Sequence, residues 1–411
     1  MKKILLLFFC LIIIFITGCA VPFHKKLDQY LAAGQYKEAD ELIESEKTNP
    51  KENIYSSKNE LLYFFDKGAI RQMIGDYKQS SEYLEKAEDI IDKLYTKSLT
   101  DETWSFFSND LNLNYTGEDF EQVMVNIIKT LNYMYEGDFD GAAVEARKIN
   151  RKLNYFQDSY GEKAIYTDDA FARYLSGFAY EAIGAVNDAY IDYKKSLKAY
   201  EKYNTIYGTA VPSFIKGDIL RMAYALKFYD EIDNLKKEWA EDVSFTKYNE
   251  LKKSAEVMIV VYDGLPAYKI DERAMPKFVN RGYAVEKILV KDADKEYTSI
   301  VAQDISKMAV KNLENKNLAI LAKTLVRNVA KKVAKEIPIL SLFVGEEKAD
   351  TRCWRTIPGR FQIVRFQVTP DSKRKIIAEI YLKGNSTPVQ EIFEIYLKPG
   401  NKKVIPIYML R

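Results

Sequence analysis

A helical hairpin with a glycine at its turn is the feature that most constrains this chain of 411 residues. Residues 117–150 carry apolar side chains at helical spacing on both sides of Gly137-Asp138-Phe139. A glycine ends a helix in the left-handed conformation at little cost, and a small residue such as Ala142 lets two helices approach closely. The same offsets recur at Gly68, Gly75, Tyr77 and Ser80, at Gly177, Gly184, Val186 and Ala189, and more weakly at Leu27, Gly34, Tyr36 and Ala39. The pattern predicts a stack of helical hairpins.

The spacing between these hairpins is irregular. Equivalent positions fall at 27, 68, 130 and 177, whereas a regular tetratricopeptide array repeats about every 34 residues. We therefore expect additional helices or loops between hairpins in a tetratricopeptide-like domain over residues 27–253, where stacking buries the apolar faces of neighbouring hairpins.

Strand signals dominate the remainder of the chain. The run 257–262 is rich in β-branched residues, and 285–290 resembles it. Two helices are expected at Tyr297 to Leu313 and at Asn317 to Glu336, followed by alternating strands at 361–368, 376–382, 390–397 and 403–409. The fold class is therefore predicted as α+β: N-terminal helical hairpin repeats, then an α/β domain over 254–411 that ends in an antiparallel meander or sandwich.

The N-terminus has the pattern of a bacterial lipoprotein signal. Lys2 and Lys3 precede the apolar run 4–16, which ends at Thr17-Gly18-Cys19. We predict a signal peptide over 1–18, acylation of Cys19 with palmitate-type chains, and a tether over 19–26. Several acyl chains anchor a protein stably, whereas one chain binds only marginally. The alternative is an uncleaved membrane anchor, although the apolar run is short for a span.

Cysteine and histidine usage restricts the chemistry. After loss of the signal and acylation of Cys19, only Cys353 remains, so no intramolecular disulfide is expected. The single histidine, His24, lies in the expected tether, which argues against Ser-His-Asp or Cys-His catalysis and against histidine-ligated zinc. No glycine-rich phosphate loop or metal-ligand motif occurs. We predict no cofactor and no metal.

Charge is divided unequally along the chain. Residues 19–254 hold 31 basic and 41 acidic side chains, and residues 255–411 hold 28 basic and 18 acidic side chains. A mature chain that is nearly neutral overall is not expected to bind nucleic acid. Opposite charges favour docking of the two regions against each other; the alternative is that the basic region faces anionic lipid or cell-wall polymer.

Several short motifs together resemble a family of bacterial lipoproteins. The residues that carry the resemblance are Tyr115, Gly117, Glu118, Phe120 and Glu121; Ala143, Glu145 and Arg147 after the Gly137-Asp138 turn; Gly264, Pro266 and Lys269; and Ala349, Asp350, Arg352, Trp354, Ile357 and Pro358. The resemblance implies tetratricopeptide-like helices followed by a β-rich domain. Genes of this family often lie near those for lipoproteins similar to a penicillin-binding-protein activator, which implies work in the cell envelope.

The candidate ligand or interface site combines two of these motifs, Gly264, Pro266 and Lys269 with Asp350, Arg352, Trp354 and Pro358. Arginine and lysine side chains would hold a carboxylate or phosphate group of a ligand. An exposed Trp354 ring beside them would stack on a sugar or peptide. The alternative places Trp354 in the core between the helices and the strands, with Arg352 either paired to Asp350 or capping a strand, and with Pro266 and Pro358 shaping loops. A second candidate, the basic helix Asn317 to Glu336, is interpreted either as membrane-facing or as a core helix with lysines at its edges.

The function predicted from these observations is a lipid-anchored protein-binding scaffold of the cell envelope. Ala20 after Cys19 favours the outer membrane facing the periplasm, because Asp at that position favours inner-membrane retention in lipoprotein families. Expected partners are other envelope proteins, including cell-wall synthesis factors. The alternative function is an enzyme that cleaves peptidoglycan or another glycan with carboxylates alone. A cleft containing an Asp or Glu of raised pKa opposite a second polar group would favour that enzyme.

Overall fold

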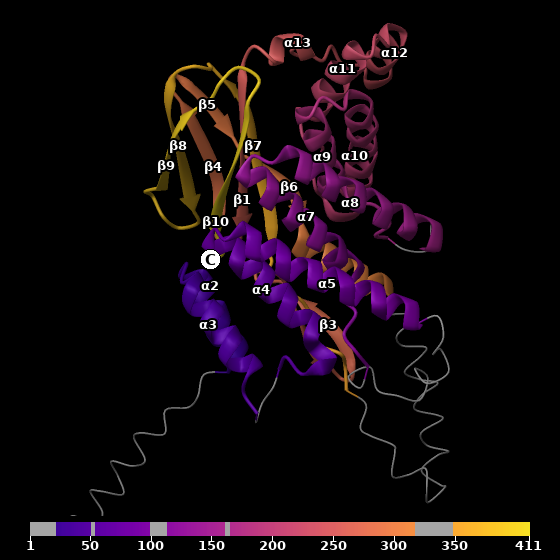
Figure 1. Ribbon diagram of the computed structural model, residues 1–411, viewed down its shortest axis with the longest axis vertical. Helices are drawn as coiled ribbons and strands as arrows, with labels where there is room; N and C mark the ends of the chain where they lie inside the picture. The colour runs from indigo at the N-terminus through magenta and orange to yellow at the C-terminus, as the bar shows by residue number, and fades with distance from the viewer. Residues whose placement is uncertain (1–21, 51–53, 99–112, 161–164, 317–347) are drawn as a thin grey trace, which may run out of the picture.

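The computed structural model describes residues 22–50, 54–98, 113–160, 165–316 and 348–411 (Figure 1). Its N-terminal part consists of helices joined in hairpins. The helices of this part are α2 (Phe23–Ala32), α3 (Tyr36–Lys47), α4 (Glu60–Ile74), α5 (Tyr77–Ser98), α7 (Asp119–Glu136), α8 (Phe139–Tyr160), α9 (Ala170–Ala182), α10 (Val186–Tyr207), α11 (Ile215–Ala225), α12 (Tyr229–Trp239) and α13 (Tyr248–Leu251). These hairpins are tetratricopeptide-like, as the glycine pattern predicts.

The glycines at the hairpin turns have the conformation that the sequence predicts. Gly75, Gly137 and Gly184 have φ angles of 90°, 82° and 80°, a region that other residues adopt only at a cost. Close packing explains Gly68, because a Cβ atom there would lie 2.5 Å from the side chain of Leu84 on the partner helix. The hairpin register is therefore set by turn conformation together with side-chain size.

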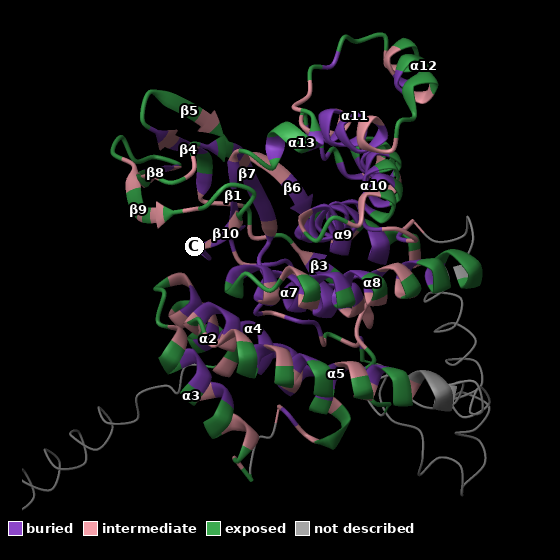
Figure 2. Ribbon diagram, turned by 45° about the horizontal axis from the view of Figure 1, so that its top comes forward, coloured by how far each residue is buried: buried purple, intermediate pink, exposed green. Residues whose placement is uncertain are grey.

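The first helices of the central hairpins, α4, α7 and α9, are largely buried (Figure 2). Eleven of the 15 residues of α4, 14 of the 18 of α7 and 12 of the 13 of α9 are buried. In the second helix α10, by contrast, only 10 of 22 residues are buried. The first helices are covered on one side by second helices and on the other by a β-sheet, and we call the sheet-facing side their inner face.

The strands form two four-stranded sheets and one separate hairpin. The inner sheet has the order β10-β1-β7-β6, the outer sheet has the order β5-β4-β8-β9, and β2 pairs with β3. The strand bounds are β1 (Ala255–Asp263), β2 (Tyr268–Glu272), β3 (Met275–Val279), β4 (Val285–Asp292), β5 (Lys295–Thr298), β6 (Ile300–Asp304), β7 (Arg360–Val368), β8 (Lys373–Leu382), β9 (Val389–Tyr396) and β10 (Lys402–Met409). All nine residues of β1 are buried because both faces of the inner sheet are covered.

Alternate residues of β1 belong to two different cores. Val257, Ile259 and Val261 pack between the two sheets, whereas Met258 and Val260 join the core of the helices. This alternation is the two-residue period of a strand. The chain therefore has three stacked layers: helices, inner sheet and outer sheet.

The strand pattern corrects part of the expected topology. A sandwich is present, but the four C-terminal strands do not form a meander, because β7 and β8 lie in different sheets and β10 pairs in parallel with β1. Two sheets bury the apolar faces of these strands in one shared core, which a single sheet would leave exposed.

Three other expectations about local structure need correction. The helix expected at Tyr297 to Leu313 begins only at residue 305, because Ile300 and Val301 pair with β7. The polar composition of residues 151–167 predicts a connector, but residues 151–160 continue α8. Within the expected tether 19–26, α2 already starts at Phe23. The helix expected at Asn317 to Glu336 lies outside the described residues.

The helices and the inner sheet dock against each other, as the opposite charges predict. Ion pairs cross the boundary from Arg355 to Asp28 and from Arg365 to Asp218, with N–O distances of 2.8 and 2.9 Å. Neutral contacts cross it as well, since the hydroxyl groups of Tyr135 on α7 and Tyr262 on β1 lie 3.0 Å apart. The helical part ends with α13, and β1 begins four residues later, close to the expected division between residues 253 and 254.

Candidate functional site

The segment 349–358 lies along the inner face of the first helices. The backbone N–H of Trp354 donates to the carboxylate of Glu121 on α7 over 2.7 Å. Two residues later, the Thr356 hydroxyl donates to Asp66 on α4 over 2.8 Å. The segment has no regular secondary structure of its own up to residue 355. It is therefore held by side chains of the helices, much as a bound peptide would be.

The indole of Trp354 is part of the core. Its ring stacks on Phe65 with centroids 4.2 Å apart and planes 16° from parallel, and its side chain is 1% exposed. Its ring N–H donates to Thr356. The interpretation that this ring stacks on a ligand is wrong for this structure, because no ring face is open. The alternative, a core tryptophan between helices and strands, is confirmed.

Arg352 is paired with Asp350, the second part of that alternative. Two of its nitrogens donate to the two carboxylate oxygens over 2.9 and 2.7 Å. A third nitrogen donates to the carbonyl of Leu113 and to the side chain of Asn59. Arg352 thus ties the segment to the helices, and its donors are used within the chain.

The second predicted motif meets the first at one point. Gly264, at the end of β1 with a φ of 70°, accepts a hydrogen bond from the N–H of Gly359 over 2.7 Å. Pro266 and Pro358 are buried beside this contact. Lys269 on β2 pairs with Glu118 at the start of α7. The structure therefore brings both motifs together, and it uses them to join the helices to the strands.

The pKa values of Glu118 and Glu121 shift in opposite directions at this buried position. Although burial acts to raise it, Lys269 and Lys316 lower the pKa of Glu118 to about 2. Burial, with the charge of Glu118 adding to it, raises the pKa of Glu121 to about 7. Opposite pKa shifts of neighbouring carboxyl groups are also found in catalytic acid–base pairs. Access to solvent therefore decides whether this pair is part of a core or of an active site.

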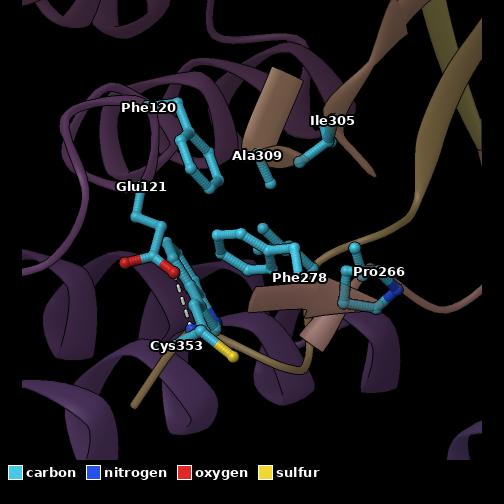
Figure 3. A pocket seen from close by; sticks show the side chains of 10 residues that line it. Phe120, Glu121, Pro266, Phe278, Ile305, Ala309 and Cys353 are labelled. Carbon is cyan, nitrogen blue, oxygen red and sulfur yellow. Dashed lines mark hydrogen bonds between the residues drawn. The ribbon is translucent and has the colours of Figure 1, made fainter. Parts of the chain in front are cut away.

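The space beside Glu121 is closed (Figure 3). It is lined by Phe120, Phe278, Cys353 and Trp354, among others, and its volume for a water-sized molecule is about 0 Å³. Burial raises the pKa of the Cys353 thiol to about 11, which keeps it protonated. This end of the interface is packed core, and no substrate reaches its carboxyl group.

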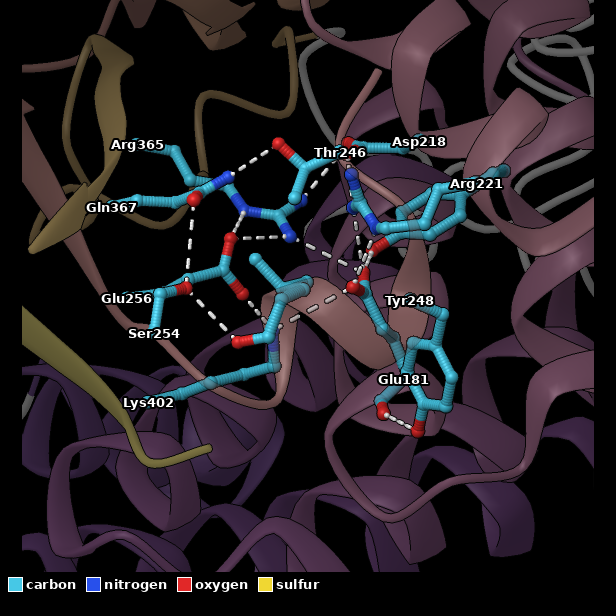
Figure 4. A network of polar contacts seen from close by, with 12 residues as sticks. Glu181, Asp218, Arg221, Thr246, Tyr248, Ser254, Glu256, Arg365, Gln367 and Lys402 are labelled. Atoms are coloured by element: carbon cyan, nitrogen blue, oxygen red, sulfur yellow. Dashed lines mark hydrogen bonds and ion pairs between the residues drawn. The ribbon is translucent and has the colours of Figure 1, made fainter. Parts of the chain in front are cut away.

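An ion-pair network at the other end of the interface was not predicted from the sequence (Figure 4). Arg365 on β7 donates to Asp218 on α11, Glu181 on α9 and Glu256 on β1, over 2.9, 3.2 and 2.9 Å. Arg221 and Lys402 complete the network through Glu181 and Glu256. The available signal was a charged residue on an apolar face: Arg365 shares its side of β7 with Phe361 and Ile363, which belong to the core of the helices.

This network borders a cleft with a volume of about 400 Å³. Burial raises the pKa of Asp218, and its arginine partners oppose that rise. Although burial also acts to raise it, Arg365 and Lys402 lower the pKa of Glu256. A raised and a lowered carboxyl group in one cleft is the feature that would favour the enzyme alternative. Asp218, however, is bonded to two guanidinium groups, so it is not free to donate a proton to a glycosidic oxygen. This geometry therefore does not give Asp218 the role of a general acid.

Other expected features fall outside these two regions. Cys19 and the basic helix at Asn317 to Glu336 lie outside the described residues. Within the described ranges, no helix has both the length and the apolar composition of a membrane span. In the same ranges, no three His, Cys, Asp or Glu side chains are grouped so that they could hold a metal ion.

Comparisons with known proteins concern the helical part. No protein-family model matches this sequence, and no curated protein matches it. Among solved structures, a Podosopora anserina kinesin light chain with nearly identical TPR-like repeats aligns with 53% of this chain and 90% of its own, at 16% identity and a TM-score of 0.33. MamA AMB-1 aligns with 54% of this chain and 92% of its own, at 15% identity and a TM-score of 0.31. At such values the hairpin architecture rests on the structure of this chain itself.

Proposed function

We propose that this chain is a lipid-anchored scaffold that binds other proteins of the bacterial cell envelope, including cell-wall synthesis factors, from the periplasmic side of the outer membrane. The observation that carries the anchor is Cys19 directly after a charged start, an apolar run and the small residues Thr17 and Gly18. Stacked helical hairpins supply the large, rigid surface that a scaffold needs.

The arrangement of the layers indicates which surface is available to partners. The inner faces of the first helices are covered by the inner sheet and by the segment 349–358, so they are occupied within the chain. The second helices keep apolar side chains in contact with solvent: Val144 on α8 and Ile191 on α10 are 44% and 41% exposed, and Tyr229 at the start of α12 is 53% exposed. Partners are therefore expected on the outer face of the second helices.

The anchor is tested by replacing Cys19 with Ala in the full-length chain and fractionating cells. We expect the variant to leave the outer-membrane fraction, while Cys10→Ala, which keeps the apolar run intact, stays in it. If the Cys19→Ala protein still sediments with outer membranes after a salt wash, the anchor assignment is wrong.

The binding surface is tested by placing a photo-crosslinking amino acid at Ile191 or at Tyr229 in intact cells. The same partner should be captured from both positions, and it should be lost when Cys19→Ala is added. A matched position at Ile392 on β9, 51% exposed, should not capture it. Capture from Ile392 alone would contradict the assignment of the surface to the second helices.

A further inference from the structure

The cleft beside Arg365 forms where the helices and the inner sheet separate. Its lining comes from α11 and the residues before it, from the loop 244–246, and from β1 and β7. Nearer the middle of the sheet, apolar side chains such as Val260 and Ile363 seal the same boundary. A volume of about 400 Å³ lies in the range of small-molecule sites, roughly 300–1,000 Å³. The cleft is therefore large enough for one sugar-sized group.

Two aromatic side chains contribute to the walls. Phe214 and Phe245 are each partly exposed. Phe214 is supported from behind by Tyr174, with ring centroids 5.0 Å apart, and Phe245 by Tyr224 at 6.0 Å. Rings held in this way are rigid surfaces for an apolar ligand face.

The loop that carries Phe245 lies close to α11. A Cβ atom at Gly217 would lie 3.3 Å from the backbone carbonyl of Ser244 and 3.8 Å from Cβ of Phe245. The absence of a side chain at Gly217 thus lets the loop approach the helix and fixes the width of the cleft at this end.

The charged groups of the lining are already paired with one another. Asp218 and Glu256 are balanced by Arg221 and Arg365. The guanidinium group of Arg365 makes five hydrogen bonds, to Glu256 twice and once each to Glu181, Asp218 and Tyr174, which uses all five of its N–H donors. A charged ligand would have to break a buried ion pair, and that is costly. The lining therefore favours an uncharged ligand.

Neutral hydrogen-bonding groups complete the lining. Ser213 and Ser244 are exposed, and the amide of Gln367 donates to the hydroxyl of Thr246 over 3.0 Å at the edge of the cleft. Hydroxyl and amide groups both donate and accept hydrogen bonds. An uncharged ligand that presents hydroxyl groups around its edge and an apolar ring face matches both the polar edge and the aromatic walls.

We propose that this cleft binds a sugar ring of an uncharged saccharide, with Phe245 against the face of the ring and Gln367 bonded to its hydroxyl groups. This goes beyond the proposed scaffold role, since it adds a small-molecule site at the opposite end of the interface from Trp354.

The test uses the full-length chain in detergent, titrated with N-acetylglucosamine, with its β-1,4-linked trimer, and with glucose 6-phosphate, and followed by saturation-transfer NMR and calorimetry. We expect saturable binding of the first two, with a dissociation constant on the order of 1 mM for the single sugar. Tighter binding of the trimer would identify a polymer as the source, and equal binding a free sugar. Tighter binding of the phosphate ester would overturn the proposal.

Matched variants locate the binding. Phe245→Ala and Gln367→Ala should each weaken it about tenfold, the effect of losing one aromatic or hydrogen-bonding contact. Phe228→Ala and Gln390→Ala, exposed residues of the same types outside the cleft, should leave it unchanged. An equal loss in the control pair, or no binding by either sugar to a chain with an unaltered melting temperature, would overturn the proposal.

Discussion

The two ends of the interface between helices and inner sheet are built from the same layers but differ in what holds them. Near Trp354 the contact consists of stacked rings and an extended segment, and the remaining space admits no water molecule. Near Arg365 the contact consists of buried ion pairs, and a cleft of about 400 Å³ opens beside them. Close packing of rings leaves no room for a ligand. The buried ion pairs, by contrast, join the helices to the inner sheet while leaving a cleft between these two layers. Of these two ends, the Arg365 end therefore has room for a ligand and the Trp354 end does not.

The largest expected effect comes from removing the cation at the open end. Arg365→Ala leaves Glu181, Asp218 and Glu256 buried with one cation fewer, and breaking such a group typically costs about 3–5 kcal/mol of unfolding free energy. Urea unfolding of the variant measures this loss. A cost below about 1 kcal/mol would mean that the ion pairs do not hold this end, and the contrast with the Trp354 end would fail.

At the closed end, Glu118 makes the interface sensitive to acid. Its folded-state pKa of about 2 is below the usual value, so its stabilising effect is present above about pH 4.5 and is lost as the pH falls towards 2. The loss is on the order of 3 kcal/mol. Urea unfolding at pH 6 and at pH 3 should give a smaller difference in unfolding free energy for Glu118→Gln than for the parent chain. Glu231→Gln, at an exposed pair with Lys194, serves as the control, and an identical pH dependence in both variants would contradict the assignment.

Within the hairpins, away from both ends, Ala142 is fully buried. Ala142→Leu should overpack the crossing of the two helices and cost about 1–3 kcal/mol. Val144→Leu on the same helix, where the side chain is 44% exposed, should cost little. Thermal unfolding compares the two, and equal melting temperatures would remove the argument that small residues set the hairpin register.

The smallest effect is expected at the surface. Lys194 pairs with Glu231 over 2.7 Å, but their side chains are 42% and 36% exposed. Exposed pairs contribute about 0–1 kcal/mol, so Lys194→Ala should unfold within that range of the parent chain. A loss as large as that of Arg365→Ala would show that burial does not distinguish the two kinds of ion pair.

Local signals in the sequence predicted the parts of the fold that local geometry determines. The hairpin turns were predictable because Gly75, Gly137 and Gly184 adopt a conformation suited to glycine. The turn between β2 and β3 was missed because Arg273 and Ala274 adopt positive φ angles there, which their residue types do not signal. The parallel pairing of β1 with β10 joins residues 146 positions apart, and nothing local to either strand indicates it.

The sequence predicted which motifs of the candidate site come together, but not which residues surround and bury them. The motifs around Gly264 and Trp354 do meet, but burial of the indole depends on Phe65, which lies far away in the sequence. The Arg365 network was missed for a related reason. Glu181, Asp218 and Glu256 come from three separate elements, and single charged residues in apolar stretches do not reveal their partners.

The pairing of β1 with β10 also has a consequence for how the chain is made. The helices of the hairpins leave the ribosome before residues 402–409, which the inner sheet that covers these helices needs. Contacts between distant segments form slowly, and exposed apolar faces promote aggregation until they are covered. During synthesis, the inner faces of α4, α7 and α9 therefore stay incompletely covered until residues 402–409 have been made. Because β10 pairs directly with the central strand β1, a chain that ends before Lys402 would expose one edge of that strand and leave this face incompletely covered.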